Sequence, residues 1–201
     1  MGDVGVDVAN DVGKSRTTAA QARIVSAALD LFAHHGVGGT SLQMIADAIG
    51  VTKAAVYHQF NTKDEIILAA AEDELAKLEA VVKAAEAERS PAQARDTLVN
   101  GIVDLAVAHR RTMSTILNDP VIYRFFTDHD AFRRVMDRMC HVLVGDDVGY
   151  EARVSTAMLT AAISGAVMHP LVAGLDDETL RSQVQLLARR LLPARRSSEL
   201  S

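Results

Sequence analysis

Residues 39–68 read GTSLQMIADAIGVTKAAVYHQFNTKDEIIL, and this stretch decides the fold. Its apolar residues recur at intervals of three and four, which is the period of a helix buried along one face. Thr40 and Gln43 form a capping-box pair that predicts the start of a short helix, and Gly50 predicts its end. Thr52 predicts the cap of a second short helix. The sequence therefore predicts two short helices joined by a tight turn.

The joint between these helices has the composition of a helix-turn-helix. Ala46 is small, which lets the two helices approach closely, and Gly50 can adopt the left-handed conformation that the turn requires. Branched apolar residues are expected to fill the joint: Ile45, Ile49, Val51 and Val56. The second helix is then free to present its other side chains outward.

Helix signals recur outside this stretch, whereas the alternation typical of strands does not. A helix is expected from about Thr18 to His35, with Gly36 as its stop, and a long one from Lys63. Ser90, Pro91 and Gln93 form a strong helix start. Further helices are predicted over about 91–109, 112–117, 120–126, 130–144 with Asp130 as cap, 151–170, and from Asp176 or Asp177 to a stop at Pro193. The sequence predicts an all-α fold of about nine helices.

Composition agrees with a helical protein and bounds its location. Hydrophobic residues make up 49% of the 201 residues, aromatic residues only 4%, and Trp is absent. Cys140 is the single cysteine, so no internal disulfide is possible and a reducing, cytoplasmic location is expected. Residues 1–16 lack the pattern of a signal peptide and are expected to form a disordered tail, and residues 194–201 a frayed end.

Charge is distributed unevenly along the chain. The net charge of −5 argues against a nucleic-acid partner when the chain is taken as a whole. Between Lys14 and Lys63, however, five basic residues face two acidic ones, which gives +3. The amino-terminal part can therefore approach phosphate groups.

Residues 21–70 resemble the DNA-binding region of the TetR family of bacterial transcriptional regulators. The matching features are Thr40, Ile45-Ala46, Gly50-Val51-Thr52, Tyr57 with Phe60, and Lys63-Asp64-Glu65. The remaining chain is similar in length, helical character and layout. The resemblance implies a helix-turn-helix head of three helices over 17–63 and a helical effector-binding and dimerisation domain over 64–193.

The resemblance also implies a function, which is a ligand-responsive repressor that binds a palindromic operator as a homodimer. A small, apolar effector would release it from double-stranded DNA. Hydroxyl groups at helix starts would grip phosphate, Lys63 would pair with phosphate, Lys53 would contact a guanine edge, and Tyr57 a thymine methyl or a phosphate. Phe60 is assigned to packing. The predicted DNA-binding residues are Thr40, Ser41, Thr52, Lys53, Ala54, Tyr57, His58 and Lys63.

The last two helices are expected to form the dimer, because one helix-turn-helix makes too few contacts for tight site selection. Small residues allow close helix approach and a leucine stripe supplies apolar area. The alternative is that both stripes face the core of the single chain. The predicted interface residues are Ala161, Ser164, Gly165, Met168, Leu180, Val184, Leu187 and Leu191.

Methionine and phenylalanine residues gather in the C-terminal part, and methionine-rich cavities accept varied apolar ligands. These residues either fill gaps in an alanine-rich core or line an effector pocket. The predicted effector-binding residues are Met113, Leu117, Phe125, Phe126, Met136, Met139, Cys140 and Met158, with Tyr123, Asn118 or His141 as polar lining.

Three other interpretations remain. Residues 154–175 carry no charged side chain and are long enough to span a membrane, but their hydroxyl groups, His169 and Pro170 favour a helix buried in a dimer. No motif of a hydrolase, nucleotide-binding enzyme or metalloprotease occurs, so an enzyme is not expected, nor a cofactor or a metal. A helical enzyme or a small-molecule carrier that uses the methionine-rich region is the alternative function.

Overall fold

The computed structural model describes residues 18–110, 119–145 and 149–192. These residues contain α-helices and no strand, which confirms the predicted all-α fold. The helices are α1 (Ala19–Gly39), α2 (Leu42–Ile49), α3 (Lys53–Gln59), α4 (Lys63–Glu86), α5 (Pro91–Ala108), α7 (Pro120–Asp128), α8 (Asp130–Val144), α9 (Tyr150–Met168) and α10 (Asp177–Leu191), with a 3-10 turn η1 (Pro170–Val172) before the last.

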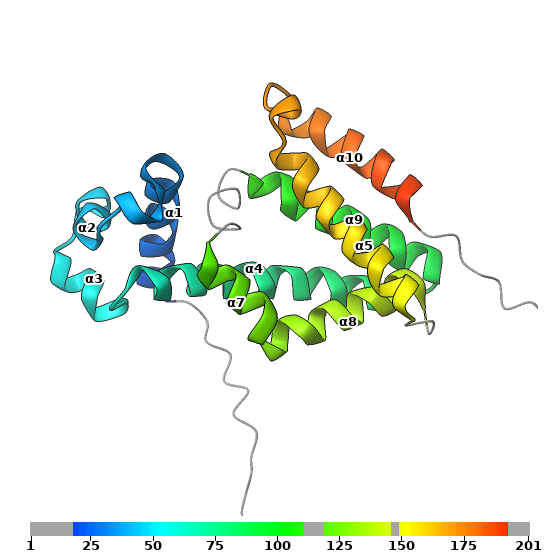
Figure 1. Cartoon of the computed structure of the whole chain (residues 1–201), viewed down its shortest axis with the longest axis horizontal. Helices are drawn as coiled ribbons and strands as arrows, with labels where there is room; N and C mark the ends of the chain where they lie inside the picture. The colour runs from blue at the N-terminus through cyan, green and yellow to red at the C-terminus, as the bar shows by residue number, and fades with distance from the viewer. Residues whose placement is uncertain (1–17, 111–118, 146–148, 193–201) are drawn as a thin grey trace, which may run out of the picture.

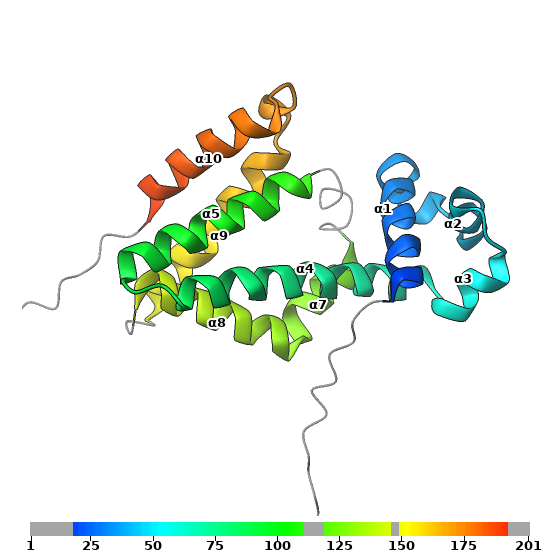
Figure 2. The ribbon, with the colours of Figure 1, turned by 180° about the vertical axis from the view of Figure 1, so that it is seen from behind.

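The helices form a head and a larger body that are joined by α4 (Figure 1). Helices α1, α2 and α3 lie together at one end, and α4 runs from this head along the body. Helix α5 packs along α4, α7 and α8 pack on α4 as well, and α9 and α10 complete the body. Helix α10 lies at the outer edge of the body in both views (Figures 1 and 2).

Local signals place most helix ends where the sequence predicts them. The Thr52 hydroxyl accepts a hydrogen bond from the backbone N–H of Ala55 at 3.2 Å, which caps α3. Gly50 ends α2 with a φ of 69°, a conformation that costs glycine little and other residues more. Ser90 accepts from the N–H of Gln93, and Pro91 is the first residue of α5. These caps set the length of each helix before tertiary packing acts.

The predicted capping box at the start of α2 is wrong by one residue. Ser41, not Thr40, is the N-cap, and its hydroxyl accepts from the backbone N–H of Met44 at 3.2 Å. Thr40 is buried instead, and its hydroxyl donates to the carbonyl of Gly36 at 2.9 Å. Helix α1 has a non-helical residue at Gly36, with a φ of 71°, and continues to Gly39, so the Thr40 hydroxyl is needed where the helix bends.

Two other helix ends differ from the prediction. Asp130 is the first residue of α8 rather than its cap, since His129 occupies the cap position and makes no side-chain capping bond. The Asp130 carboxylate pairs with Arg133 in the first turn instead. Helix α7 extends two residues beyond Phe126, to Asp128.

Two hydrophobic clusters form the interior, and α4 contributes to both. The first joins the head to the start of α4 through residues such as Phe32, Ile45 and Ile67, each fully buried. It also includes Ile122 and Phe125 of α7. The second cluster joins α4, α5, α8, α9 and α10. The head therefore shares its core with α4 and α7.

Some predictions fall outside the described residues: the disordered tail over 1–16, the short helix over 112–117, the stop at Pro193 and the frayed end over 194–201. No helix in the described part of the chain is long and apolar enough to cross a membrane.

Candidate nucleic-acid interface and effector cavity

Helix α3 is held on the outside of the head by contacts on one side only. Val56 is fully buried against the head core, together with Ile45 and Ala46 of α2. The Arg23 guanidinium of α1 donates to the carbonyl of Ile49 at 3.2 Å and ties α1 to the turn. The predicted joint of the helix-turn-helix is thus present, with its small residue at the crossing.

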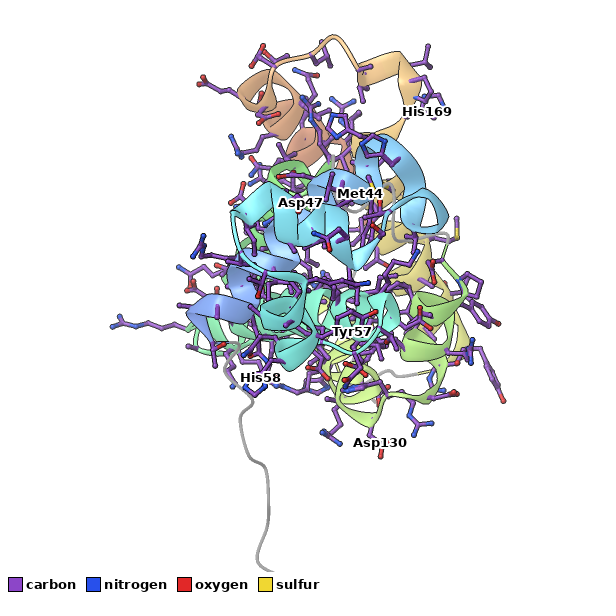
Figure 3. The ribbon with its side chains drawn as sticks, turned by 90° about the vertical axis from the view of Figure 1, so that its left-hand side faces the viewer. Met44, Asp47, Tyr57, His58, Asp130 and His169 are labelled. Atoms are coloured by element: carbon purple, nitrogen blue, oxygen red, sulfur yellow. The ribbon has the colours of Figure 1, made fainter. Side chains whose placement is uncertain are left out.

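The opposite face of α3 is free. Lys53, Ala54, Tyr57 and His58 are all exposed, as predicted for residues that contact DNA. The Lys53 ammonium lies 5.3 Å from the centre of the Tyr57 ring, within the range of a cation–π contact. Figure 3 looks onto this end of the molecule, with Tyr57 and His58 of α3 and Met44 and Asp47 of α2 labelled.

The predicted phosphate-gripping hydroxyls differ in their surroundings. Ser41 and Thr52 are exposed helix caps, and each hydroxyl accepts a backbone N–H, which leaves its own proton available to an outside acceptor. Thr40 is only 2% exposed, and its hydroxyl already donates a hydrogen bond to the Gly36 carbonyl. Thr40 is therefore a structural residue rather than a surface donor, which corrects its assignment.

Lys63 has a role that the sequence did not indicate. Its ammonium donates to the carbonyls of Val37 and Thr40, the latter at 2.8 Å, and so joins the start of α4 to the end of α1. An ammonium carries three donors, so one N–H remains for a phosphate. The predicted phosphate contact is not tested by this geometry and stays a prediction.

A cavity of about 350 Å³ lies in the body between α4, α5, α7, α8 and α9. Most of its wall is apolar, and aromatic rings of α7 and α8 form one side of it. The Phe126 and Phe132 rings lie 4.8 Å apart, and Phe125 packs edge-on to both. The volume is within the range of sites for small organic molecules.

Four of the predicted effector-binding residues line this cavity: Phe125, Phe126, Met136 and Met139. Cys140 is buried but does not contribute to the wall, and Met158 is 68% exposed on the outer face of α9. The two assignments are therefore corrected, since neighbours in sequence point to different sides of a helix. Met113 and Leu117 lie outside the described residues.

The polar part of the wall was not predicted. It comprises Glu74 on α4, His109 and Arg110 around the end of α5, and Thr160 and Ser164 on α9. Tyr123, which was expected to supply polar lining, is 70% exposed on α7, and His141 is exposed on α8. Asn118 is outside the described residues. Only the fold brings α4, the end of α5 and α9 together, so no local sequence signal marks this set.

The charged and titratable groups of the cavity wall are partly paired with one another and with neighbouring residues. The Glu74 carboxylate accepts a hydrogen bond from Lys77 at 2.7 Å. Burial lowers the pKa of Lys77, but hydrogen bonds to Asp73 and Glu74 outweigh burial and hold this pKa above its usual value. His109 Nδ1 lies 3.1 Å from the other Glu74 oxygen, yet the angle is not that of a hydrogen bond, so Nδ1 is buried without a hydrogen-bond partner.

The predicted dimer residues fall into three groups. Leu180 and Val184 are buried in the core of the chain itself, which corrects their assignment, because positions 180, 184 and 188 face α5 and α9. Ala161, Ser164 and Met168 line the cavity. Gly165, Leu187 and Leu191 are exposed, as an interface requires.

An exposed apolar stripe runs beside these residues and includes side chains that were not predicted. On α9 it contains Tyr150, Val154 and Met158, which are 90%, 57% and 68% exposed, and on α10 it contains Leu186 with Leu187 and Leu191. Spacings of four residues place the α9 set on one helix face, and on α10 the same spacing joins Leu187 and Leu191, with Leu186 beside Leu187. On α10 the predicted set combined two faces: Leu187 and Leu191 lie on the exposed one, whereas Leu180 and Val184 lie on the buried one.

Residues 24–70 match the model of a family described as bacterial regulatory proteins, tetR family. In this head region the chain is similar to the TetR family. The transcriptional regulator SrpR of Pseudomonas putida is 45% identical over 60 residues, which cover 27% of this chain and 28% of SrpR. The transcriptional repressor AcnR of Corynebacterium diphtheriae is 26% identical over 172 residues, 82% of this chain and 87% of AcnR. The TetR likeness is thus densest in the head.

The fold is also that of solved TetR-type proteins. The structure of a SmeT–triclosan complex superposes on this chain with a TM-score of 0.66 and 20% sequence identity. The alignment covers 92% of this chain and 99% of the SmeT chain. At this level of identity the likeness concerns the fold alone. It includes the body as well as the head, since nearly the whole chain is aligned.

Proposed function

We propose that this chain is a transcriptional regulator that binds a palindromic operator as a homodimer and is released by a small molecule held in the body cavity. The observation that carries the proposal is the exposed face of α3, where Lys53 and Tyr57 project from a helix-turn-helix. Relatives with the same head are named as regulators or repressors, which supports repression as the outcome.

Helix α3 would lie in the major groove. Lys53 would contact a guanine edge and Tyr57 a thymine methyl or a phosphate. Ser41, Thr52 and the remaining N–H of Lys63 would bind phosphate oxygens. Ala54 offers little hydrogen bonding to bases, so DNA shape would contribute much of the specificity.

Dimerisation would use the apolar stripe on α9 and α10. The stripe consists of large apolar side chains that are about half exposed or more, on two helices that pack against one another. Contiguous apolar surface of this kind marks protein interaction sites. A dimer built on the two outer helices would leave both heads free to occupy half-sites about 34–36 Å apart.

Effector binding would act through side chains that line the cavity and also pack in the hydrophobic core of the head. Ile122 and Phe125 line the cavity and also belong to the cluster that contains the head core. Ala71 of α4 does the same. A ligand that displaces these side chains would change the angle of α4 and the distance between the heads, with a coupling on the order of 1–3 kcal/mol.

Selection of bound sites from a random duplex DNA pool tests this function. The native protein is stripped of ligand, assayed at low salt, and compared with a Lys53→Ala, Tyr57→Ala double variant. A Lys83→Ala variant serves as control, because Lys83 is an exposed lysine of α4 far along the chain from the head. We expect a palindrome with the native protein and the control, and none with the double variant.

The same experiment separates the alternative of a small-molecule carrier or a helical enzyme. If folded native protein enriches no site, the DNA-binding function is wrong and the cavity alone is the functional site. In that case the double variant would bind ligands as well as the native protein, since neither Lys53 nor Tyr57 lines the cavity.

A further inference from the structure

Three titratable residues of the cavity wall lie close together, in a lining that is otherwise mostly apolar. Glu74, His109 and Arg110 come from the middle of α4 and the end of α5, while phenylalanine and methionine side chains form much of the remaining wall. A ligand that matches this wall has an apolar body and a single polar group. The charge of that group depends on which of the three side chains can take a new partner.

Arg110 has donors that the described residues do not use. Its Nη2 donates to the carbonyl of Leu175 at 3.1 Å and lies 2.9 Å from the Asp177 carboxylate. Both contacts involve Nη2, and no described residue accepts from Nη1 or Nε. The side chain is only 15% exposed, so these three N–H groups are not freely solvated. A half-buried guanidinium with unused donors favours an acceptor, and most strongly an anionic one.

The Glu74 carboxylate is in the opposite situation. One of its oxygens accepts from Lys77 at 2.7 Å, and the other faces His109 at 3.1 Å. Its charge is therefore already partnered within the protein. His109 Nδ1 is buried, lies near the Glu74 carboxylate and makes no hydrogen bond with the part of the chain that the structure describes, so His109 adds a second group beside Arg110 that can still take a hydrogen-bond partner.

We propose that the effector is an amphiphilic carboxylate, whose carboxylate binds Arg110 beside His109 and whose apolar body lies against the Phe125, Phe126 and Met136 wall. This inference rests on the proposed function, because it names the chemical class of the effector. It also links the cavity to α10, since the guanidinium that binds the ligand carboxylate also contacts Leu175 in the loop before α10 and Asp177, the first residue of α10.

Calorimetric titration of the full chain without DNA tests the proposal. The probes are saturated linear monocarboxylates of about 6 to 12 carbons and 2-naphthoate, each compared with the alcohol and the amine of the same skeleton. We expect the carboxylates to bind more tightly than the matched alcohols and amines. Arg110→Gln should weaken carboxylate binding about tenfold to a hundredfold, as for the loss of a charged hydrogen bond, and leave alcohol binding unchanged.

Two variants separate recognition from a structural effect. Asp177→Asn breaks the same ion pair but leaves Arg110 in place without its carboxylate partner, so carboxylate affinity should rise. If Arg110 acted only by holding the α9–α10 loop, Asp177→Asn and Arg110→Gln would weaken binding alike, which would overturn the proposal. Arg181→Gln removes a charge that pairs with Asp104 away from the cavity and should have no effect.

The remaining outcomes are equally decisive. Equal affinity for acids and alcohols, or no binding by any acid, overturns the carboxylate class. Tighter binding of the amines also overturns it and assigns recognition to Glu74. Because the titration contains no DNA, these results leave the operator selection untouched, and a failed selection with a positive titration overturns the proposed function instead.

Discussion

The Lys53 ammonium and the Tyr57 ring lie one turn apart on α3 and contact each other at 5.3 Å. The ring therefore restricts the position of the lysine before any DNA is present. We expect Tyr57→Phe, which keeps the ring, to retain most of the operator affinity. Tyr57→Ala should lower it about tenfold or more, the loss expected when a base contact worth about 1–3 kcal/mol is removed. Fluorescence anisotropy with the selected operator measures both, and equal losses would show that the hydroxyl rather than the ring matters.

Lys63 should contribute to stability as well as to DNA affinity. Lys63→Met removes the hydrogen bonds to the Val37 and Thr40 carbonyls and should lower the free energy of unfolding by about 1–3 kcal/mol. Urea denaturation measures this, with Lys83→Met as an exposed control on the same helix. If the third N–H binds a phosphate, the logarithmic slope of the salt dependence of operator binding should also fall by about 0.9 for each protomer. Unchanged stability would show that the carbonyl contacts contribute nothing.

The exposed stripe should determine the oligomeric state. Met158→Glu places a charge in the middle of the apolar face of α9, and we expect the dimer to dissociate because a buried carboxylate without a partner is costly. Tyr123→Glu is the control, since Tyr123 is 70% exposed on α7, away from the stripe. Sedimentation velocity distinguishes dimer from monomer. A Met158→Glu protein that remains dimeric would place the interface elsewhere.

The close approach of α4 and α5 depends on Gly101. A Cβ atom at this position would lie 2.4 Å from Cγ1 of Val81, which is too short for two carbon atoms. Gly101→Ala should therefore lose part or all of the helix-propensity gain of about 1 kcal/mol to overpacking that costs about 1–3 kcal/mol. In a Val81→Ala background the same change should stabilise the protein. Thermal unfolding of the four variants measures the coupling, and additive effects would contradict the contact.

An ion pair between α4 and α8 should make stability depend on pH. Arg138 binds Glu86 through two hydrogen bonds, of 2.9 and 2.5 Å, and these hold the pKa of Glu86 below its usual 4.5. Since the folded-state pKa is lowered, the stabilisation is complete above the unfolded-state pKa and is lost as the pH falls through the folded-state value. The pair is about one third exposed, so its contribution is at most about 1 kcal/mol.

Arg138→Gln should accordingly lower the free energy of unfolding at pH 7 and have no effect at an acid pH at which Glu86 is protonated in the folded protein. Urea denaturation at both pH values tests this, with Arg134→Gln as the control, because Arg134 is an exposed arginine of the same helix. An equal loss at both pH values would mean that Arg138 acts through packing of its aliphatic stem rather than through its charge.

Most of the head was predictable because its signals are local. Gly50, Thr52 and the spacing of Ile45 and Val56 act within one or two turns, and each has the predicted role. The start of α2 was misplaced because Thr40 and Ser41 are both capping residues. Only the bend at Gly36, which requires the Thr40 hydroxyl, determines which of them becomes the cap.

The body was less predictable because its sites join distant segments. Phe125, Phe126, Met136 and Met139 were found from composition, but the charged end of the cavity joins residues 74, 109 and 110 through the packing of α4 and α5. On α10, Leu180, Val184, Leu187 and Leu191 form a single apolar series in sequence. In the structure Leu180 and Val184 are buried, whereas Leu187 and Leu191 are exposed. The sequence does not show which side of α10 packs against α5 and α9, so it cannot separate the two pairs.

The sharing of Ile122 and Phe125 between the head core and the cavity wall limits how this protein can be rearranged. The predicted boundary at residue 63 does not separate folding units, since Ile66, Ile67 and Ala70 of α4 complete the head core. A chimaera joined at residue 63 would leave the head without part of its interior. A transplantable head has to carry the first turns of α4, and its new body has to supply a substitute for α7.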